Sequence, residues 1–183
     1  MITISPPHAA LNDPRAPAIA RMRYTYFVGR TESRRDIIDR IVHAASLTPR
    51  NRLSNVVISC HGSAGHLTLG EGFGTAHASL FAAWRGKVHK VWLRACRVAQ
   101  RDATGGSLPA AIARAARCHV VASTEPQTER RGRRLPYGRL DTFEGYVVSF
   151  APTGQVTWDE RYPSMWYETG ADGRRRPRHR NPD

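Results

Sequence analysis

Two chemically reactive residues each follow an apolar run of the kind that forms a buried strand. His61 comes directly after "NVVISC", and Cys96 comes directly after "VWLRA". If both runs are neighbouring strands of one parallel sheet, their carboxyl ends meet at the same edge, with the strand ends about 5 Å apart. A thiol becomes an effective nucleophile where an imidazole favours its thiolate. We therefore interpret His61 and Cys96 as a candidate catalytic dyad.

The residue after the histidine suits the same chemistry. Gly62 has no Cβ, so its backbone can approach a substrate closely. Its N–H and that of Cys96 are candidate donors to the oxyanion that forms during acyl transfer. We expect no metal or other cofactor, because Cys60 and His61 would point to opposite faces of an extended chain. Cys60 and Cys118 are predicted to be core thiols, since free cysteine behaves as a small hydrophobe.

The elements that must position these residues alternate between strands and helices. Thr31 is the expected cap of the first helix, and Ser107, with Pro109 in the first turn, caps the last. The expected strands are residues 22–29, 55–59, 90–95 and 119–123, and the expected helices are residues 32–45, 76–84 and 107–116. Residues 65–72 are expected to form a small hairpin arm, and residues 145–160 a β-hairpin. This pattern predicts an α/β fold with three layers, α/β/α, around a mainly parallel central sheet, followed by a C-terminal β-hairpin.

Composition divides the chain into three parts. Residues 1–20 are rich in Pro and Ala without periodicity, which indicates an extended N-terminal arm. Residues 21–169 form the predicted domain, including a long polar loop at 124–143 that is typical of functional loops. Residues 170–183 are rich in Arg, Pro and Gly and are predicted to be a disordered tail.

The charge of the chain is strongly positive. The formal net charge is +13 over 183 residues, and all but two of the basic residues, Lys87 and Lys90, are arginines. Such an arginine bias follows equally from a GC-rich genome, so we favour a solvated surface over nucleic-acid binding. No run is long enough to span a membrane, and neither a leader nor a disulfide pattern is evident. We therefore expect a cytoplasmic protein, or one secreted by a route without a cleavable signal peptide.

The two reactive segments resemble a known superfamily. "VVISCHG" and "VWLRACR" are similar to the strand-His-Gly and strand-Ala-Cys segments of the caspase-like cysteine peptidases, which include gingipains, clostripain, legumain, separase, CHAT-domain proteases and self-cleaving toxin domains. The resemblance covers residues 55–123 and implies a caspase-like peptidase domain over residues 21–169. It implies that His61 is the catalytic histidine, Cys96 the nucleophile and Gly62 an oxyanion donor. Arg94 and Val98 depart from the caspase signature, and the His-to-Cys interval is shorter than in caspases.

The resemblance also indicates which residues would bind substrate. Arg94 stands where caspases have a pocket residue, which favours an acidic residue before the scissile bond. Asp141, Glu144 and Asp159 favour a basic residue instead, and both alternatives stay open. Ser123, at the end of the strand after Cys96, is a further substrate-binding candidate. With a basic preference, the arginines of the 124–143 loop, Arg130, Arg131, Arg133 and Arg134, would be sites of activating self-cleavage.

The function expected from these features is that of a cysteine endopeptidase acting on protein or peptide substrates. The resemblance places it among bacterial effectors or toxins. Two alternatives remain: a non-catalytic caspase-like interaction module, and a basic nucleic-acid-binding protein. A Cys-His pair also supports acyl transfer to acceptors other than water.

Overall fold

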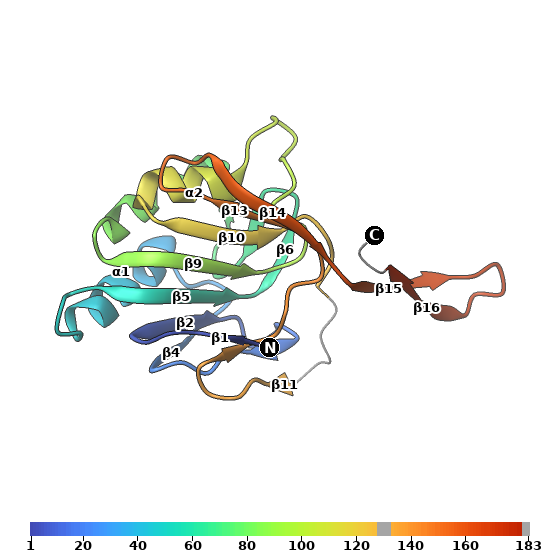
Figure 1. The fold of residues 1–183 in the computed structure, drawn as a ribbon, viewed down its shortest axis with the longest axis horizontal. Coiled ribbons are helices and arrows are strands. Elements are labelled where there is room, and N and C mark those ends of the chain that lie inside the picture. The colour runs from blue at the N-terminus through green and yellow to red at the C-terminus, as the bar shows by residue number, and fades with distance from the viewer. Residues whose placement is uncertain (128–132, 181–183) are drawn as a thin grey trace.

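A seven-stranded mixed sheet forms the centre of the protein. The computed structural model describes residues 1–127 and 133–180 (Figure 1). In spatial order the sheet contains β14 (Val156–Tyr162), β13 (Gly145–Phe150), β10 (His119–Ser123), β9 (Val88–Arg94), β5 (Leu53–Ser59), β2 (His8–Asn12) and β4 (Tyr24–Phe27). The five strands from β10 to β4 are parallel to one another. β13 is antiparallel to both of its neighbours, β10 and β14. The predicted α/β class, mainly parallel sheet and hairpin are confirmed.

Smaller elements surround this sheet. They are α1 (Arg34–Ser46), the 3₁₀ helix η1 (Thr75–Trp84), α2 (Leu108–Ala116), the pair β1 (Ile2–Thr3) and β12 (Arg139–Leu140), the pair β3 (Ala18–Ile19) and β11 (Arg133–Arg134), the three-stranded sheet β6 (His61–Ser63), β7 (His66–Thr68) and β8 (Phe73–Gly74), and the hairpin β15 (Ser164–Thr169) and β16 (Arg175–Arg180). None of the helices in the described ranges combines the length and the apolar character that a membrane crossing requires.

Local sequence explains the ends of the helices. Ser107 caps α2 and Pro109 lies in its first turn, as predicted. The cap of α1 is Ser33 rather than Thr31: its hydroxyl accepts the N–H of Asp36 and donates to the Asp36 carboxylate. Asp36, three residues after Ser33, makes this reciprocal pairing possible, which is why the helix begins later than expected.

The helices α1, η1 and α2 pack on one face of the sheet. The larger hydrophobic cluster contains the buried residues of α1, η1 and α2, with Trp84 donating its indole N–H to the carbonyl of Ile38. The opposite face is covered by residues of the N-terminal segment and of the segment after residue 134, including Met22, Leu135 and Phe143. The second helical layer of the predicted α/β/α arrangement is therefore not found among the described residues. Irregular segments with apolar side chains take its place.

The first strand of the central sheet was not foreseen from the sequence. Residues 8–12, predicted to lie in an arm, form β2, which pairs with both β4 and β5 and is buried at every position. The prediction is wrong for this segment, because a short Ala-containing run after two prolines lacks strand propensity. Its place in the sheet comes from contacts with distant segments. The sheet therefore begins at residue 8, not near residue 21.

The tail is also ordered over part of its length. β16 pairs antiparallel with β15, and Figure 1 shows this hairpin projecting away from the rest of the domain. The predicted disorder over 170–183 is therefore wrong for residues 175–180. Strand pairing satisfies backbone groups whatever the side chains are, so an Arg-rich composition does not prevent it. Residues 181–183 lie outside the described residues.

The position of β2 leads to a stability prediction. Leu11 in β2 is fully buried, whereas Leu80 in η1 is 38% exposed. We expect Leu11→Ala to lower the free energy of unfolding by about 2–5 kcal/mol, because it removes core contacts and leaves a cavity. Leu80→Ala, the matched control, should change it by less than about 1 kcal/mol. Urea denaturation of both variants checks this. Equal, small effects would mean that residues 8–12 are not a core strand.

Candidate active site

The strands that carry the two reactive residues are neighbours. β5 and β9 pair in parallel, with Ser59 opposite Arg94, and the N–H of Cys60 bonds to the Arg94 carbonyl at 3.3 Å. His61 and Cys96 therefore leave the sheet at the same edge, two residues beyond this last pair of the ladder. The condition on which the interpretation of the dyad depends, that the two strands are neighbours in a parallel sheet, is met.

The His-Gly loop, which begins with His61 and Gly62 at the start of β6, packs directly on the cysteine loop, the segment after β9 that contains Ala95 and Cys96. A Cβ built on Gly62 would lie 2.9 Å from the Cβ of Ala95, 2.9 Å from the carbonyl oxygen of Cys96 and 3.1 Å from that of His66. Real Cβ atoms rarely come so close, and backbone atoms cannot easily yield. Only glycine thus allows the observed contact between the two loops.

His61 is oriented by a backbone carbonyl. Its Nε2 lies 3.0 Å from the carbonyl oxygen of Arg15. A carbonyl only accepts hydrogen bonds, so Nε2 carries the proton in this arrangement. In the neutral ring Nδ1 is then the nitrogen that can take a proton. The contact assigns one tautomer to His61 and leaves one nitrogen for acid–base work.

A buried carboxylate that the sequence analysis missed lies beside this histidine. Asp13 is 1% exposed, follows β2, and binds Arg15 through both of its oxygens. Burial alone would raise the pKa of Asp13, but hydrogen bonds from Arg15, together with the charges of Arg15 and His61, outweigh it and hold the pKa below its usual value. Asp13 is therefore ionised at neutral pH and places a negative charge near His61. The signal was the pair Asn-Asp at the end of "HAAL", hidden because this run was not taken for a strand.

The main chain of Gln127 contacts the sulfur of Cys96. The N–H of Gln127 donates to Cys96 Sγ at 3.3 Å, and the thiol in turn lies 3.8 Å from the carbonyl oxygen of Gln127. Within the described part of the chain, the N–H of Cys96 has no hydrogen-bond acceptor. Arg97, the next residue, has a φ of 58°, a conformation that non-glycine residues seldom adopt. Such strain is found preferentially at functional sites.

The loop after Cys96 is fixed by a carboxylate. Asp102 accepts hydrogen bonds from the N–H groups of Thr104 and Gly106 and from the hydroxyls of Thr104 and Thr75. These bonds hold the pKa of Asp102 far below its usual value, those from Thr104 and Thr75 most of all. The loop between Cys96 and α2 is thereby tied to the start of η1.

A small pocket joins the reactive residues. Its lining consists of Pro17, Ser59, Cys60, His61, Arg94, Ala95, Cys96 and Gln127. The side chain of Gln127 lies next to Arg94, because its Oε1 accepts from Arg94 Nη1 at 2.7 Å and from the N–H of Glu144. Gln127 was not expected from the sequence, since it lies in the long polar loop without a motif.

Arg94 is a wall of this pocket. It is 5% exposed, and its guanidinium lies over the Phe143 ring at 4.8 Å. Desolvation lowers the pKa of Arg94 to about 10, and the charges of Asp141 and Glu144 oppose this shift. Arg94 and Asp141 are thus electrostatically coupled near Cys96.

Ser123 does not fit the role of a substrate contact. It is fully buried, and its hydroxyl donates to the carbonyls of Glu144 and Tyr146 and accepts from the N–H of Glu125. These contacts fasten the end of β10 to the start of β13. The residue lies at a strand end, as expected, but the polar groups it satisfies belong to the protein.

The other two thiols are inert by position. Cys60 is 3% exposed and Cys118 is 1% exposed. Burial raises the pKa of Cys118 to about 12, and it raises that of Cys60 even further, with the charge of Asp13 adding to the effect. The prediction that both are core thiols is confirmed. Among the described residues, no group of three His, Cys, Asp or Glu side chains is arranged to hold a metal ion.

Comparison with protein-family models, with curated proteins and with solved structures found no match to this chain.

Proposed function

We propose that this chain is a cysteine endopeptidase in which Cys96 is the nucleophile and His61 transfers protons. The observation that carries the proposal is the convergence of both residues on one pocket, from the carboxyl ends of two adjacent parallel strands. The caspase-like resemblance is retained for the strand-His-Gly and strand-Ala-Cys segments. A caspase-like arrangement of the whole domain is part of the proposal and rests on these segments.

Sheet topology supports the location independently. The chain passes from β2 to β4 on one side and then returns to β5 on the other, so the strand order reverses between β2 and β5. In open α/β sheets, ligands bind outside the carboxyl ends of the strands at such a reversal. Asp13 follows β2 and His61 follows β5 at this point.

The chemistry requires only groups of this chain and water. The Cys96 thiolate attacks the carbonyl carbon of the scissile peptide, and the carbonyl oxygen becomes an oxyanion that the N–H groups of Gly62 and Cys96 would hold. The protonated His61 gives its proton to the leaving amine as the C–N bond breaks, which leaves a thioester on Cys96. His61 then removes a proton from water, whose oxygen attacks the thioester; the C–S bond breaks, and the departing carboxylic acid leaves the Cys96 thiolate beside the again protonated His61.

Substrate binding requires one local movement. The Gln127 N–H contacts the sulfur and its side chain occupies the space beside Arg94, so a peptide would have to displace Gln127 to reach Cys96. The proposed self-cleavage sites Arg130 and Arg131 lie outside the described residues. The choice between an acidic and a basic residue before the scissile bond depends on the balance between Arg94 and the nearby Asp141 and Glu144.

A thiol-directed probe tests the proposal. A mixture of peptidyl acyloxymethyl ketones that vary in the residue next to the reactive carbon should give one covalent adduct, which peptide mapping assigns to Cys96. Cys118→Ala, the matched control, should be labelled as the unmodified protein is, since Cys118 is buried. Cys96→Ala should give no adduct. Absence of an adduct on the unmodified protein, or labelling that survives loss of Cys96, would contradict the proposal and favour a non-catalytic module.

A further inference from the structure

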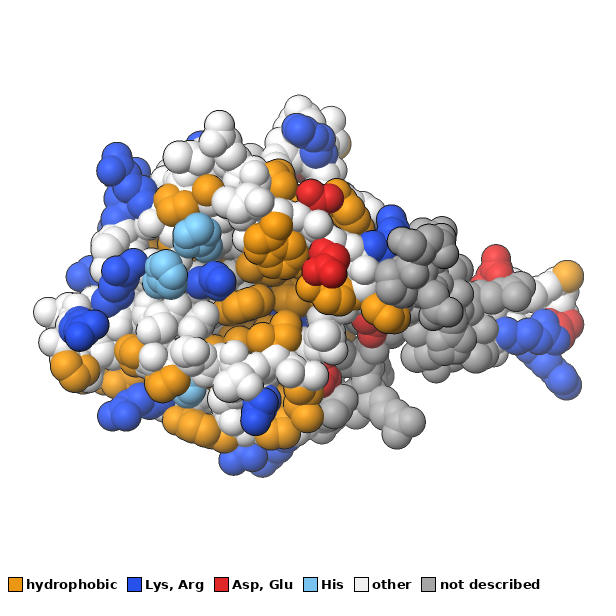
Figure 2. Space-filling view, viewed as in Figure 1, with side chains coloured by type: hydrophobic (Ala, Val, Ile, Leu, Met, Phe, Trp, Pro, Cys, Tyr) orange, Lys and Arg blue, Asp and Glu red, His pale blue; other side chains and the backbone are white. Residues whose placement is uncertain are grey.

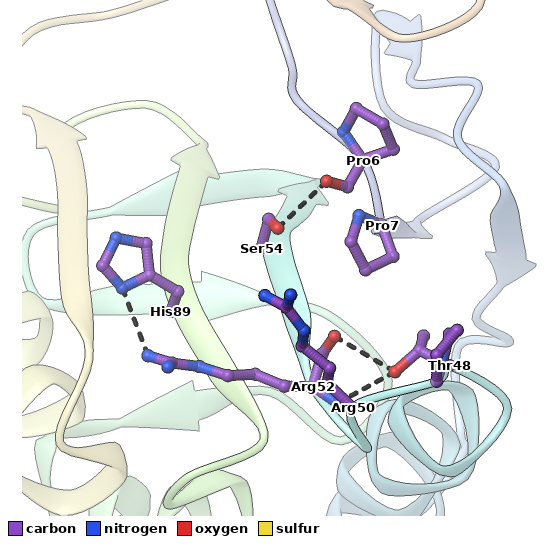
Figure 3. Close-up of a pocket in the computed structure, with 8 residues that line it drawn as sticks. Pro6, Pro7, Thr48, Arg50, Arg52, Ser54 and His89 are labelled. Carbon is purple, nitrogen blue, oxygen red and sulfur yellow. Dashed lines mark hydrogen bonds between the residues drawn. The ribbon is translucent and has the colours of Figure 1, made fainter.

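A second pocket lies at the amino-terminal ends of the central strands, opposite to the carboxyl ends that carry Cys96. It is formed where β2, β5 and β9 begin and has a volume of about 500 Å³, which is within the range of small-molecule sites. Its lining consists of Pro6, Pro7, Thr48, Pro49, Arg50, Arg52, Ser54 and His89 (Figure 3). None of these residues takes part in the proposed catalytic chemistry.

The charged groups of this pocket are all basic. In Figure 3 the guanidinium of Arg52 reaches His89, with Arg52 Nη2 3.3 Å from His89 Nδ1. The guanidinium of Arg50 points up toward Ser54 and Pro7. The lining contains no carboxylate, and neither Arg50 nor Arg52 forms an ion pair within the described ranges of the chain. Two uncompensated arginines in one concavity create a positive potential that attracts anions.

Further positive charge lies close by. His89 packs against the ring of His119 with centroids 5.5 Å apart, and Lys90 follows it on the same strand. Figure 2 shows histidine and Lys or Arg side chains together toward the left end of the molecule, where Figure 1 shows these strands beginning. Desolvation lowers the pKa of His89, and the charges of Arg52, His119 and Lys90 lower it further. An anion bound there would relieve this repulsion.

The remaining lining consists of three prolines and two hydroxyl residues, Thr48 and Ser54, whose hydroxyls donate to backbone carbonyls. The rings of Pro6, Pro7 and Pro49 have no N–H to donate, and the Ser54 hydroxyl already donates to the carbonyl of Pro6 at 3.0 Å. The pocket thus presents arginine donors on one side and apolar proline rings on the other. A ligand that matches both carries a compact anion on an apolar group.

We propose that this pocket binds a phosphate-bearing small molecule, with Arg50 and Arg52 on the phosphate oxygens and the three prolines against an apolar part of the ligand. Arginine suits phosphate because its planar group presents paired N–H donors to two oxygens. The imidazole of His89 accepts from Arg52 through Nδ1 and keeps its Nε2–H as a further donor. The proposal does not depend on the peptidase activity.

Isothermal titration calorimetry with pyrophosphate, adenosine 5′-monophosphate and adenosine tests this assignment. We expect saturable one-site binding of the two phosphate compounds, tighter for the nucleotide, and none of adenosine. The double variant Arg50→Gln/Arg52→Gln should weaken binding at least about tenfold, as loss of charge-assisted hydrogen bonds implies. Arg35→Gln/Arg21→Gln removes two charges outside the pocket lining and should leave the affinity within about twofold. The backbone bonds of Arg52 to Thr48 stay in the variant, and thermal unfolding verifies that it folds.

Several outcomes would overturn the proposal. The first is the absence of saturable binding to the unmodified, folded protein. The second is binding that both double variants weaken equally, because equal losses indicate general attraction to a basic surface. A single-stranded oligonucleotide that binds more tightly than the nucleotide, with equal loss in both variants, would point to nucleic acid instead. As a second readout, NMR titration of the His89 ring should show its pKa rising when pyrophosphate binds, because the bound anion offsets the charges of Arg52, His119 and Lys90.

Discussion

Cys96→Ala is expected to reduce the hydrolysis of a mixed peptide library by at least about 10⁴-fold, because removal of a catalytic nucleophile costs this much or more in related chemistry. His61→Ala should cause a loss of similar order, since the thiol then lacks its proton-transfer partner. Residues that act as one unit are not additive, so the double variant should be no slower than the single variants. Mass spectrometry of the cleaved library measures all three rates.

The matched control is Cys118→Ala, which removes a thiol that is 1% exposed. This variant should keep the rate of the unmodified protein, apart from any loss of folded material that thermal unfolding would reveal. Multiplicative losses in the double variant would mean that Cys96 and His61 act independently. Hydrolysis that persists in Cys96→Ala would exclude Cys96 as the nucleophile.

The paired strands were predictable because the local pattern and the tertiary structure agree. The run before His61 is continuously apolar, and Val56, Val57 and Ile58 are indeed buried on both faces of the sheet. Such a run needs strands on both sides and cover above and below, which almost determines a central position in an α/β sheet. From that position, the placement of His61 and Cys96 at one edge follows from the parallel direction alone.

Other parts of the site depend on contacts that no local pattern encodes. β2 has weak strand propensity and is stabilised by β4 and β5, so Asp13 and the Arg15 carbonyl could not be placed beside His61 beforehand. Gln127 reaches Cys96 from 31 residues further along the chain. Ser123 shows the converse: its position at a strand end was right, but only the fold reveals that its hydroxyl bonds to the backbone of β13.

The missing helical layer has a similar cause. The loop between β10 and β13 looks polar along the sequence, yet Leu135, Leu140 and Phe143 turn inward and cover the face that a helix would otherwise cover. Three apolar residues spread over nine positions form no helical or strand period, so they gave no signal. Figure 2 shows hydrophobic side chains in the middle of the visible face. Cover of a sheet by irregular chain is therefore difficult to distinguish in advance from an exposed loop.

Gly62→Ala is expected to lower peptide hydrolysis by at least about 10²-fold with the thiol of Cys96 intact. Gly62 does not have a positive φ, so alanine is compatible with its backbone conformation and only space is at issue. The added Cβ would meet the Ala95 Cβ and the Cys96 carbonyl oxygen at 2.9 Å, and the second of these is a backbone atom that cannot turn away. The His-Gly loop must then move from the cysteine loop by several tenths of an ångström, which misaligns both His61 and the oxyanion donor.

Gly29→Ala is the matched control, because a Cβ at Gly29 would have no atom within 4 Å. It should hydrolyse the library as the unmodified protein does. Gly62→Ala should also lose about 1–3 kcal/mol of unfolding free energy through overpacking, so activity must be measured under conditions where urea denaturation shows it to be folded. Equal activity of the two folded variants would mean that close contact between the two loops is not needed for catalysis. A large loss at Gly62 alone, with Cys96 still open to a small alkylating reagent, would separate oxyanion placement from thiol access.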